Sequence, residues 1–170
     1  MSEKLPDEKQ AGGEYPLPDE LRFDWREAEK DIINEIKWHL ANTGAEKIVI
    51  GLSGGVDSSL SLYLGVQALG KENVVALFLP EQGTTPDYDI EDAHAVAELL
   101  QVKLVEKEIT PLINIFVAAL PEISGNQIAL ANVKARIRMI LLYAVANSLG
   151  KAQVMGTSDK SELLLGYTTK

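Results

Sequence analysis

Residues 47–59 read Lys-Ile-Val-Ile-Gly-Leu-Ser-Gly-Gly-Val-Asp-Ser-Ser, and this segment says most about the architecture of the chain. Its first half is a run of β-branched and aliphatic side chains that ends at Leu52, as is typical of a central parallel strand covered on both faces. Gly54 and Gly55 then allow a sharp turn and a close approach of the backbone to a ligand. A helix expected to begin near Val56 directs its N-terminal amides and the positive end of its dipole into the turn. The stretch therefore predicts an anion-binding loop between a buried strand and a helix.

The same loop lacks the lysine of a Walker-type phosphate loop, in which Lys and Ser or Thr follow the last glycine. Here Asp57 stands among the hydroxyls of Ser53, Ser58 and Ser59. A carboxylate repels phosphate unless a divalent cation lies between them, so Asp57 predicts a Mg²⁺ ion. The alternative is a simple helix cap, which Asp and Ser both favour. A cap explains one polar residue, but not two glycines, three serines and an aspartate directly after a buried strand.

The string at residues 51–58, Gly-Leu-Ser-Gly-Gly-Val-Asp-Ser, resembles the signature of the PP-loop ATP pyrophosphatase superfamily. Members of that superfamily bind the pyrophosphate end of ATP and cleave between the α- and β-phosphates, which activates a substrate as its adenylate. They include NAD synthetase, GMP synthetase, asparagine synthetase and several tRNA-modifying enzymes. The loop alone leaves the choice among them open.

Length and composition narrow the class of protein. A chain of 170 residues is expected to form one domain with a core of its own, and the absence of cysteine excludes disulfides and zinc–thiolate sites. The N-terminus lacks the apolar stretch of a secretory signal, and the longest wholly apolar run, residues 139–146, is too short to span a bilayer. An intracellular, cytoplasmic protein without a membrane segment is therefore expected. The net charge of −9 argues against a nucleic-acid partner.

Apolar periodicity and turn residues divide the chain into a tail, residues 1–20, and one PP-loop domain, residues 21–170. Helices are expected at 21–42, 56–69, 90–100, 111–120, 128–149 and 158–165, and strands at 47–52, 74–79, 102–109 and 153–156. The first helix is expected to bury one stripe, formed by Trp25, Ala28, Ile32, Ile36 and Leu40. This alternation predicts an α/β fold with a doubly wound, mainly parallel sheet flanked by helices. The loop at 81–89 would leave the carboxyl end of a strand, where such sheets bind ligands.

The long helix at 128–149 carries three cations. Arg136 shares a stripe with apolar side chains, namely Met139, Ile140 and Tyr143, and a buried arginine needs an anionic partner. That partner is either a structural carboxylate or a ligand phosphate, and the sequence leaves both open. Lys134 and Arg138 fall on roughly the opposite face and are expected to be solvated or to lie at an interface. Residues 139–146 are apolar on all sides, which indicates burial on more than one side, including against a second subunit.

The segment at 155–162 follows a short expected strand. That strand ends at Gly156 and Thr157, which places a hydroxyl at the carboxyl edge of the sheet, close to the loop at 51–58. Glu162 falls in the first turns of the next helix. Its carboxylate either stabilises the helix dipole or supplies a second oxygen ligand to the Mg²⁺ that Asp57 requires.

Three further strings narrow the resemblance to NAD synthetase. They are Asn-Val-Lys-Ala-Arg-Ile-Arg-Met at 132–139, Gly-Thr-Ser-Asp-Lys-Ser-Glu at 156–162 and Gly-Tyr-Thr-Thr-Lys at 166–170, and the Leu79-Pro80 loop is also similar. The resemblance covers about residues 25–170 and implies the adenine nucleotide alpha hydrolase-like fold. It implies catalytic roles for Asp57, Ser53 and Ser58, and magnesium ligation by Asp57 and Glu162. It further implies deamido-NAD binding by Arg136 and Lys170, and ATP binding by Gly51, Leu52, Ser53, Gly54, Gly55, Val56, Asp57, Ser58 and Thr157.

The activity that this resemblance implies is ammonia-dependent synthesis of NAD⁺. ATP adenylates the nicotinate carboxylate of deamido-NAD, and ammonia then displaces AMP, which leaves NAD⁺, AMP and pyrophosphate. A glutamine-hydrolysing domain would use a cysteine nucleophile, and the chain has none. Free ammonia or a partner amidotransferase is therefore the expected nitrogen source, and the expected assembly is a homodimer.

The NAD synthetase family continues past the last of these strings, so the chain is expected to be a C-terminally truncated form. Two other functions stay open at this point. One is a different PP-loop adenylating enzyme, and the other is a non-catalytic module that binds a nucleotide or dimerises.

Overall fold

The computed structural model describes residues 24–166 and residue 169, and its centre is a sheet of four parallel strands. The strands lie in the order β3-β2-β1-β4, where β1 is Lys47–Leu52, β2 is Val74–Phe78, β3 is Lys103–Glu106 and β4 is Ala152–Met155. All three neighbouring pairs are parallel, which confirms the predicted doubly wound α/β class. The chain moves outward from β1 to β3 and then crosses back to β4, so the strand order reverses between β1 and β4. Ligands bind at the carboxyl ends of strands beside such a reversal.

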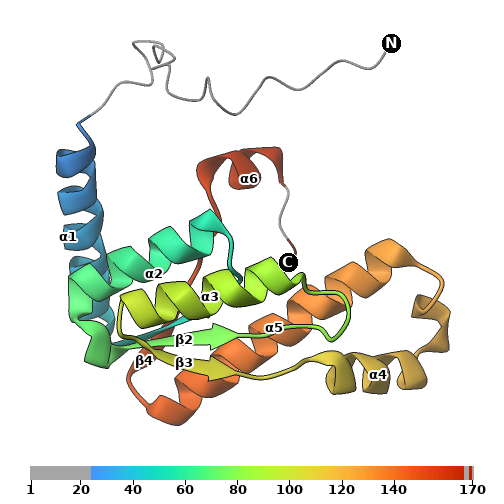
Figure 1. Ribbon diagram of the computed structural model, residues 1–170. Coiled ribbons are helices and arrows are strands. Elements are labelled where there is room, and N and C mark those ends of the chain that lie inside the picture. Colours follow the sequence, from blue (N-terminus) through green and yellow to red (C-terminus); the bar gives the residue numbers. More distant parts are fainter. Residues whose placement is uncertain (1–23, 167–168, 170) are drawn as a thin grey trace, which may run out of the picture.

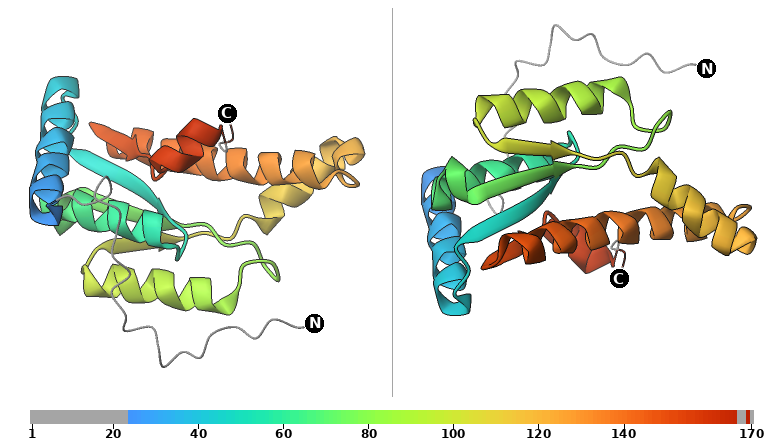
Figure 2. Two further views of the ribbon diagram at one scale, coloured as in Figure 1. Left: turned by 90° about the horizontal axis from the view of Figure 1, so that it is seen from above. Right: turned by 90° about the horizontal axis from the view of Figure 1, so that it is seen from below.

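Helices cover both faces of the sheet (Figures 1 and 2). The long helices are α1 (Trp25–Thr43), α2 (Val56–Leu69), α3 (Asp87–Leu99), α4 (Thr110–Ala119) and α5 (Gln127–Leu149). Helices α2 and α3 pack on one face and α4 and α5 on the other, while α1 stands at one end against α2. The short helix α6 (Lys160–Leu165) follows β4, and two 3-10 turns cover Lys71–Asn73 and Pro121–Ile123.

The core consists of two apolar layers separated by the sheet. Ile48, Ile50 and Leu52 point from β1 towards α2 and α3, whereas Val49 points towards α5. These four side chains are at most 2% exposed, so β1 is covered on both faces, as its sequence predicts. A buried central strand of this kind fixes the position of the loop that follows it.

Most helix and strand boundaries agree with the sequence, and their ends have local causes. The Asp24 side chain caps α1 by accepting a hydrogen bond from the Arg26 amide at 2.9 Å, and Gly44 ends that helix in the left-handed conformation with φ +70°. Helix α3 begins at Asp87 rather than near residue 90, because Pro86 supplies an extended residue before it. Two aspartates therefore lie in its first turn, where the helix dipole favours them.

The predicted burial of one complete stripe of α1 is wrong. Trp25 is 65% exposed and Ile32 is 45% exposed, whereas Leu40 is buried and Ile36 partly so. Only the C-terminal half of α1 reaches the core, because the helix extends beyond the edge of the sheet (Figure 1). Residues 21–23, where the helix was expected to begin, and the predicted tail at 1–20 lie outside the described residues.

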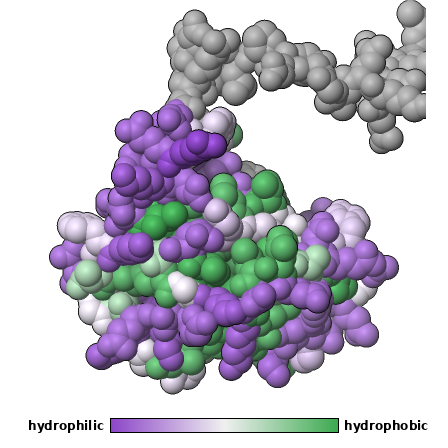
Figure 3. Space-filling view, turned by 60° about the vertical axis from the view of Figure 1, so that its left-hand side comes forward, coloured by the Kyte–Doolittle hydropathy of each residue, from purple (hydrophilic) through white to green (hydrophobic). Residues whose placement is uncertain are grey.

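The surface carries apolar as well as charged regions. Figure 3 shows hydrophobic residues gathered in the middle of one face, below the hydrophilic column of α1. Exposed apolar side chains also line α6, where Leu163, Leu164 and Leu165 are 64%, 76% and 83% exposed. Within the part of the chain that the structure describes, no helix combines the length and apolarity needed to cross a membrane.

Helix α2 offers a matched test of this packing. Leu62 is fully buried under the sheet and Leu60 is 54% exposed on the same helix. We expect Leu62→Ala to lower the free energy of unfolding by about 2–5 kcal/mol because it leaves a cavity. Leu60→Ala should change it by less than about 0.5 kcal/mol. Urea denaturation followed by circular dichroism measures both, and equal losses would contradict this placement of α2.

Candidate active site

The loop between β1 and α2 takes its shape from one glycine. Gly54 has φ +88°, a left-handed conformation that side chains disfavour, and a Cβ at this position would lie 2.5 Å from the backbone oxygen of Asp89. The loop therefore packs directly on the first turn of α3. No residue larger than glycine fits there unless the backbone moves.

The loop serines have different roles. Ser58 is 4% exposed, and its Oγ donates a hydrogen bond to the Gly55 carbonyl at 2.9 Å and accepts one from the Ser53 amide at 3.1 Å. Ser53 is exposed, and its Oγ lies 3.1 Å from that of Ser58. Ser59 Oγ also donates to the Gly55 carbonyl, at 2.9 Å. All three serines thus hold the loop closed, since Ser53 Oγ also accepts a hydrogen bond from the Gly55 amide at 3.3 Å. Ser53 is the exposed one of these serines that also lines the cleft beside the loop.

The first turn of α2 follows the glycine turn directly and has no capping side chain. Gly55 is the N-cap residue, and no side chain accepts a hydrogen bond from the first amides of the helix. By contrast, Asn126 caps α5 by accepting a hydrogen bond from the Ala129 amide at 3.0 Å. The first amides of a helix need acceptors, and an anion supplies them. Asp57 lies in this first turn with its side chain exposed.

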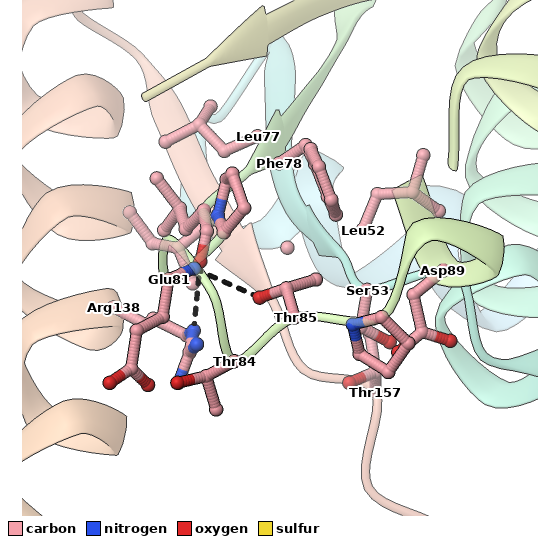
Figure 4. A pocket seen from close by; sticks show the side chains of 15 residues that line it. Leu52, Ser53, Leu77, Phe78, Glu81, Thr84, Thr85, Asp89, Arg138 and Thr157 are labelled. Carbon is pink, nitrogen blue, oxygen red and sulfur yellow. Dashed lines mark hydrogen bonds between the residues drawn. The ribbon is translucent and has the colours of Figure 1, made fainter. Parts of the chain in front are cut away.

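A cleft of about 490 Å³ opens beside the loop, at the carboxyl ends of the strands. Its walls come from the ends of β1 and β2, the loop after β2, the start of α3, helix α5 and the residue two places after β4. They comprise Gly51, Leu52, Ser53, Leu77, Phe78, Leu79, Pro80, Glu81, Thr84, Thr85, Pro86, Asp89, Arg138, Leu142 and Thr157. Figure 4 shows Glu81 and Arg138 on one side of the cleft and Ser53, Asp89 and Thr157 on the other. The structure thus brings together Ser53 and Thr157, which lie far apart in the sequence.

The prediction that Lys134 and Arg138 are solvated or lie at an interface is wrong. The ammonium of Lys134 lies 2.6 Å from Glu81 Oε1, and the two side chains are only 21% and 13% exposed. Arg138 donates a hydrogen bond from Nε to the Leu79 carbonyl at 3.1 Å. Burial lowers the pKa of Arg138, and the charge of Glu81 opposes that shift. These residues fasten the loop after β2 to α5.

Comparison with known proteins identifies the family. The family model described as NAD synthase matches residues 28–170. This chain belongs to the NAD synthase family. It is 47% identical over 145 residues to an NH(3)-dependent NAD(+) synthetase of Methanococcoides burtonii, an alignment that covers 85% of this chain and 54% of the relative. A protein of the same name from Archaeoglobus fulgidus is 47% identical over 139 residues, which cover 82% of this chain and 55% of the relative.

Solved structures of an NAD synthetase and of an NMN synthetase share the fold. The NH3-dependent NAD synthetase of Campylobacter jejuni superposes with a TM-score of 0.78 at 38% identity, and covers 87% of this chain and 62% of its own. The NMN synthetase of Francisella tularensis superposes with a TM-score of 0.80 at 31% identity, and the match covers 88% of this chain and 60% of that one. This chain therefore spans about half the length of the curated NAD synthases that it matches.

Helix α5 meets the core with a different face from the one that its sequence predicts. Ile137 and Ala146 are 3% and 2% exposed, whereas the predicted stripe of Met139, Ile140 and Tyr143 is 43%, 55% and 53% exposed. Arg136 is exposed too. This stripe is therefore not buried within the chain itself, because apolar residues on every side of the helix do not indicate which face packs, and its burial against a second subunit stays a prediction. A role of Arg136 in binding a dinucleotide stays a prediction.

Glu162, the second expected magnesium ligand, lies in a capping box. Its amide donates to Asp159 Oδ1 at 2.7 Å, and its carboxylate accepts a hydrogen bond from the Asp159 amide at 3.3 Å. Among residues 24–166 and 169, no three acidic or histidine side chains are grouped to hold a metal. Mg²⁺ usually binds through one or two carboxylates together with substrate phosphates, so the exposed Asp57 fits such an ion. Lys170 lies outside the described residues.

The sequence placed the loop at 81–89, and with it Glu81 and Asp89, where such sheets bind ligands, but it did not single out Arg138 or Leu142 as cleft residues. Arg138 and Leu142 are four positions apart on α5 and so share a stripe, which is the signal that could have revealed them. That signal becomes visible only once the packed face of α5 is known.

Two glycines with positive φ permit a test of the loop geometry. Gly54→Ala should combine the strain of φ +88° with a clash at 2.5 Å, whereas Gly83→Ala has φ +69° and nothing within 4 Å. Strain alone costs about 1–2 kcal/mol. We expect Gly54→Ala to be clearly more destabilising in urea denaturation and to lose nucleotide binding. Equal stability and equal binding in the two variants would contradict the packing of the loop on α3.

Proposed function

We propose that this chain supplies the ATP-binding part of an ammonia-dependent NAD⁺ synthetase. The reaction joins ammonia to the nicotinate carboxylate of deamido-NAD, driven by cleavage of ATP to AMP and pyrophosphate. One observation carries the proposal: uncapped amides at the start of α2, behind a glycine turn, open beside a cleft at the strand reversal. Similarity to relatives named NH(3)-dependent NAD(+) synthetase supports the same reaction.

The proposed position of ATP follows from the polarity of the walls. The pyrophosphate end would lie at the serine loop, where the first amides of α2 would donate hydrogen bonds to it. Ser53 would join them by giving up its hydrogen bond to Ser58. The nucleoside end would extend into the cleft, where Leu52, Phe78 and Leu142 form apolar walls. Donors placed in this way stabilise the charge that develops on the departing pyrophosphate, and each is typically worth a factor of about 10²–10³ in rate. Thr157 would contact the nucleotide from the end of β4.

Magnesium would be held by Asp57 together with phosphate oxygens, and Glu162 would join it by giving up its capping bond. When bound, such an ion neutralises phosphate charge and orients the departing group. Deamido-NAD would be bound by Arg136 and Lys170. Its nicotinate carboxylate would attack the α-phosphorus, so no nucleophilic side chain is required. Free ammonia is the proposed nitrogen source, which the names of the NH(3)-dependent relatives support, and the cytoplasm is the proposed compartment.

The test combines binding and turnover. Calorimetric titration with Mg-ATP and with deamido-NAD should give saturable binding, and addition of ammonia should yield NAD⁺ and AMP in equal amounts. Binding without turnover would instead indicate a nucleotide-binding module. Preference for nicotinate mononucleotide over deamido-NAD would indicate the activity named for the Francisella tularensis relative.

A single carboxylate substitution tests the metal argument. Asp57→Asn keeps the size of an exposed side chain, so the melting temperature should change little, whereas ATP turnover should fall by at least about 10²-fold. Asp87→Asn is the matched control, since Asp87 is an exposed acidic residue in the first turn of α3. It should retain turnover. Near-normal turnover of Asp57→Asn would remove the case for magnesium at this position.

We also propose a homodimer formed through the exposed stripe of α5. Met139, Ile140 and Tyr143 present apolar surface there, and covering such surface is favourable. Sedimentation velocity should show a dimer that Tyr143→Glu dissociates. Tyr88→Glu is the control, because Tyr88 is 65% exposed on α3, and it should leave the dimer intact. A monomeric wild-type chain would refute the assembly.

A further inference from the structure

Three charged side chains meet at the wall of the cleft that lies opposite the serine loop. Glu81 comes from the loop after β2, and Lys134 and Arg138 come from successive turns of α5. Glu81 and Arg138 both line the cleft, where they lie side by side in Figure 4. Lys134 and Arg138 lie within the string at 132–139, but the resemblance to the NAD synthetase family implied no function for them or for Glu81.

The three charges are not balanced within this group. Lys134 pairs with Glu81 at 2.6 Å, with both side chains largely buried, so the negative charge of Glu81 is already matched. Among the described residues, the hydrogen bond of the Arg138 guanidinium goes from Nε to the neutral carbonyl of Leu79. The group therefore carries one net positive charge, and that charge sits on Arg138 at the cleft wall.

This surplus charge is costly unless the cleft receives an anion. Burial lowers the pKa of Arg138, which means that the guanidinium has lost part of its hydration. A partly desolvated cation is stabilised by an anion that accepts its hydrogen bonds. Because Nε is used by Leu79, the two terminal nitrogens of the planar fork remain for such an anion, and two parallel donors match the oxygens of a phosphate.

We propose that Arg138 binds a phosphate group of a substrate in the cleft, and that Lys134 positions it by keeping the Glu81 carboxylate paired. The inference rests on the proposed function for the nature of the substrates, because the phosphate belongs to either ATP or deamido-NAD. Glu81 and Lys134 are positioning residues: they hold the loop on α5 and leave the charge of Arg138 directed at the ligand. Without Lys134, the unpaired Glu81 would compete with that ligand for the guanidinium.

The first experiment removes the guanidinium. Calorimetric titration of the wild-type chain, Arg138→Gln and Arg138→Lys with Mg-ATP and with deamido-NAD should show at least about tenfold weaker binding of one ligand to Arg138→Gln. Arg138→Lys should be intermediate, because it keeps the charge and loses the fork. The ligand that loses affinity identifies the source of the phosphate. Affinities within about twofold of wild type for both ligands would overturn the proposal, as would a wild-type chain that binds neither.

The second experiment tests the positioning role by restoring binding. Lys134→Met should weaken binding of the same ligand about tenfold, because the Glu81 carboxylate then pairs with the Arg138 guanidinium in place of the ligand. Adding Glu81→Gln to that variant removes the competing carboxylate and should return the affinity to within about threefold of wild type. Glu81→Gln alone should bind no more weakly than wild type. If the double variant binds as weakly as Lys134→Met, the pair is merely a tether and the positioning role is refuted.

Both experiments measure only ligand binding, so failure of this inference can be told apart from failure of the proposed activity. A chain that binds ATP through Arg138 but makes no NAD⁺ would refute the proposed activity and keep the inference. A chain that makes NAD⁺ and binds both ligands equally well after Arg138→Gln would support the proposed activity and refute the inference.

Discussion

The site depends on one arrangement: the first amides of α2 have no capping side chain and follow a glycine turn that lies beside the cleft. Gly54 holds that turn against α3, since any side chain there would meet the backbone of Asp89. The hydrogen bonds of Ser58 to Gly55 and Ser53 hold the loop in this conformation without a ligand. A preformed set of donors loses little freedom on binding, which is why such a loop suits a charged phosphate group.

The sheet makes this arrangement possible. Because β1 is buried on both faces and the strand order reverses between β1 and β4, the loop after β1 and Thr157 after β4 reach the same cleft. Helix α5 closes the opposite wall with a packed face that carries Ile137 and Arg138. Its other face leaves apolar side chains exposed. The same helix thus lines the proposed nucleotide cleft on one side and offers a proposed subunit contact on the other.

The sequence predicted the parts of this protein that local pattern controls. The apolar run of β1, the glycine turn and the start of α2 lie where their residues indicate, since each follows from neighbours along the chain. Side-chain burial on α5 was not predictable, because its apolar residues occur on all sides. The contact of Arg138 with Leu79 joins positions 59 apart, and no periodicity reveals such a pair. The sequence allowed two interpretations of Glu162, namely stabilisation of the helix dipole and ligation of magnesium. In this structure its carboxylate caps its own helix.

The most direct measurement is an NMR titration of the backbone amides of residues 53–59 with inorganic pyrophosphate and then with Mg-ATP. If the uncapped first turn of α2 is the phosphate site, the amides of Val56, Asp57 and Ser58 should shift most and become protected from hydrogen exchange. The capped first turn of α5, which begins after Asn126, should stay unchanged. Saturable binding of Mg-ATP with no change at residues 53–59 would contradict the account.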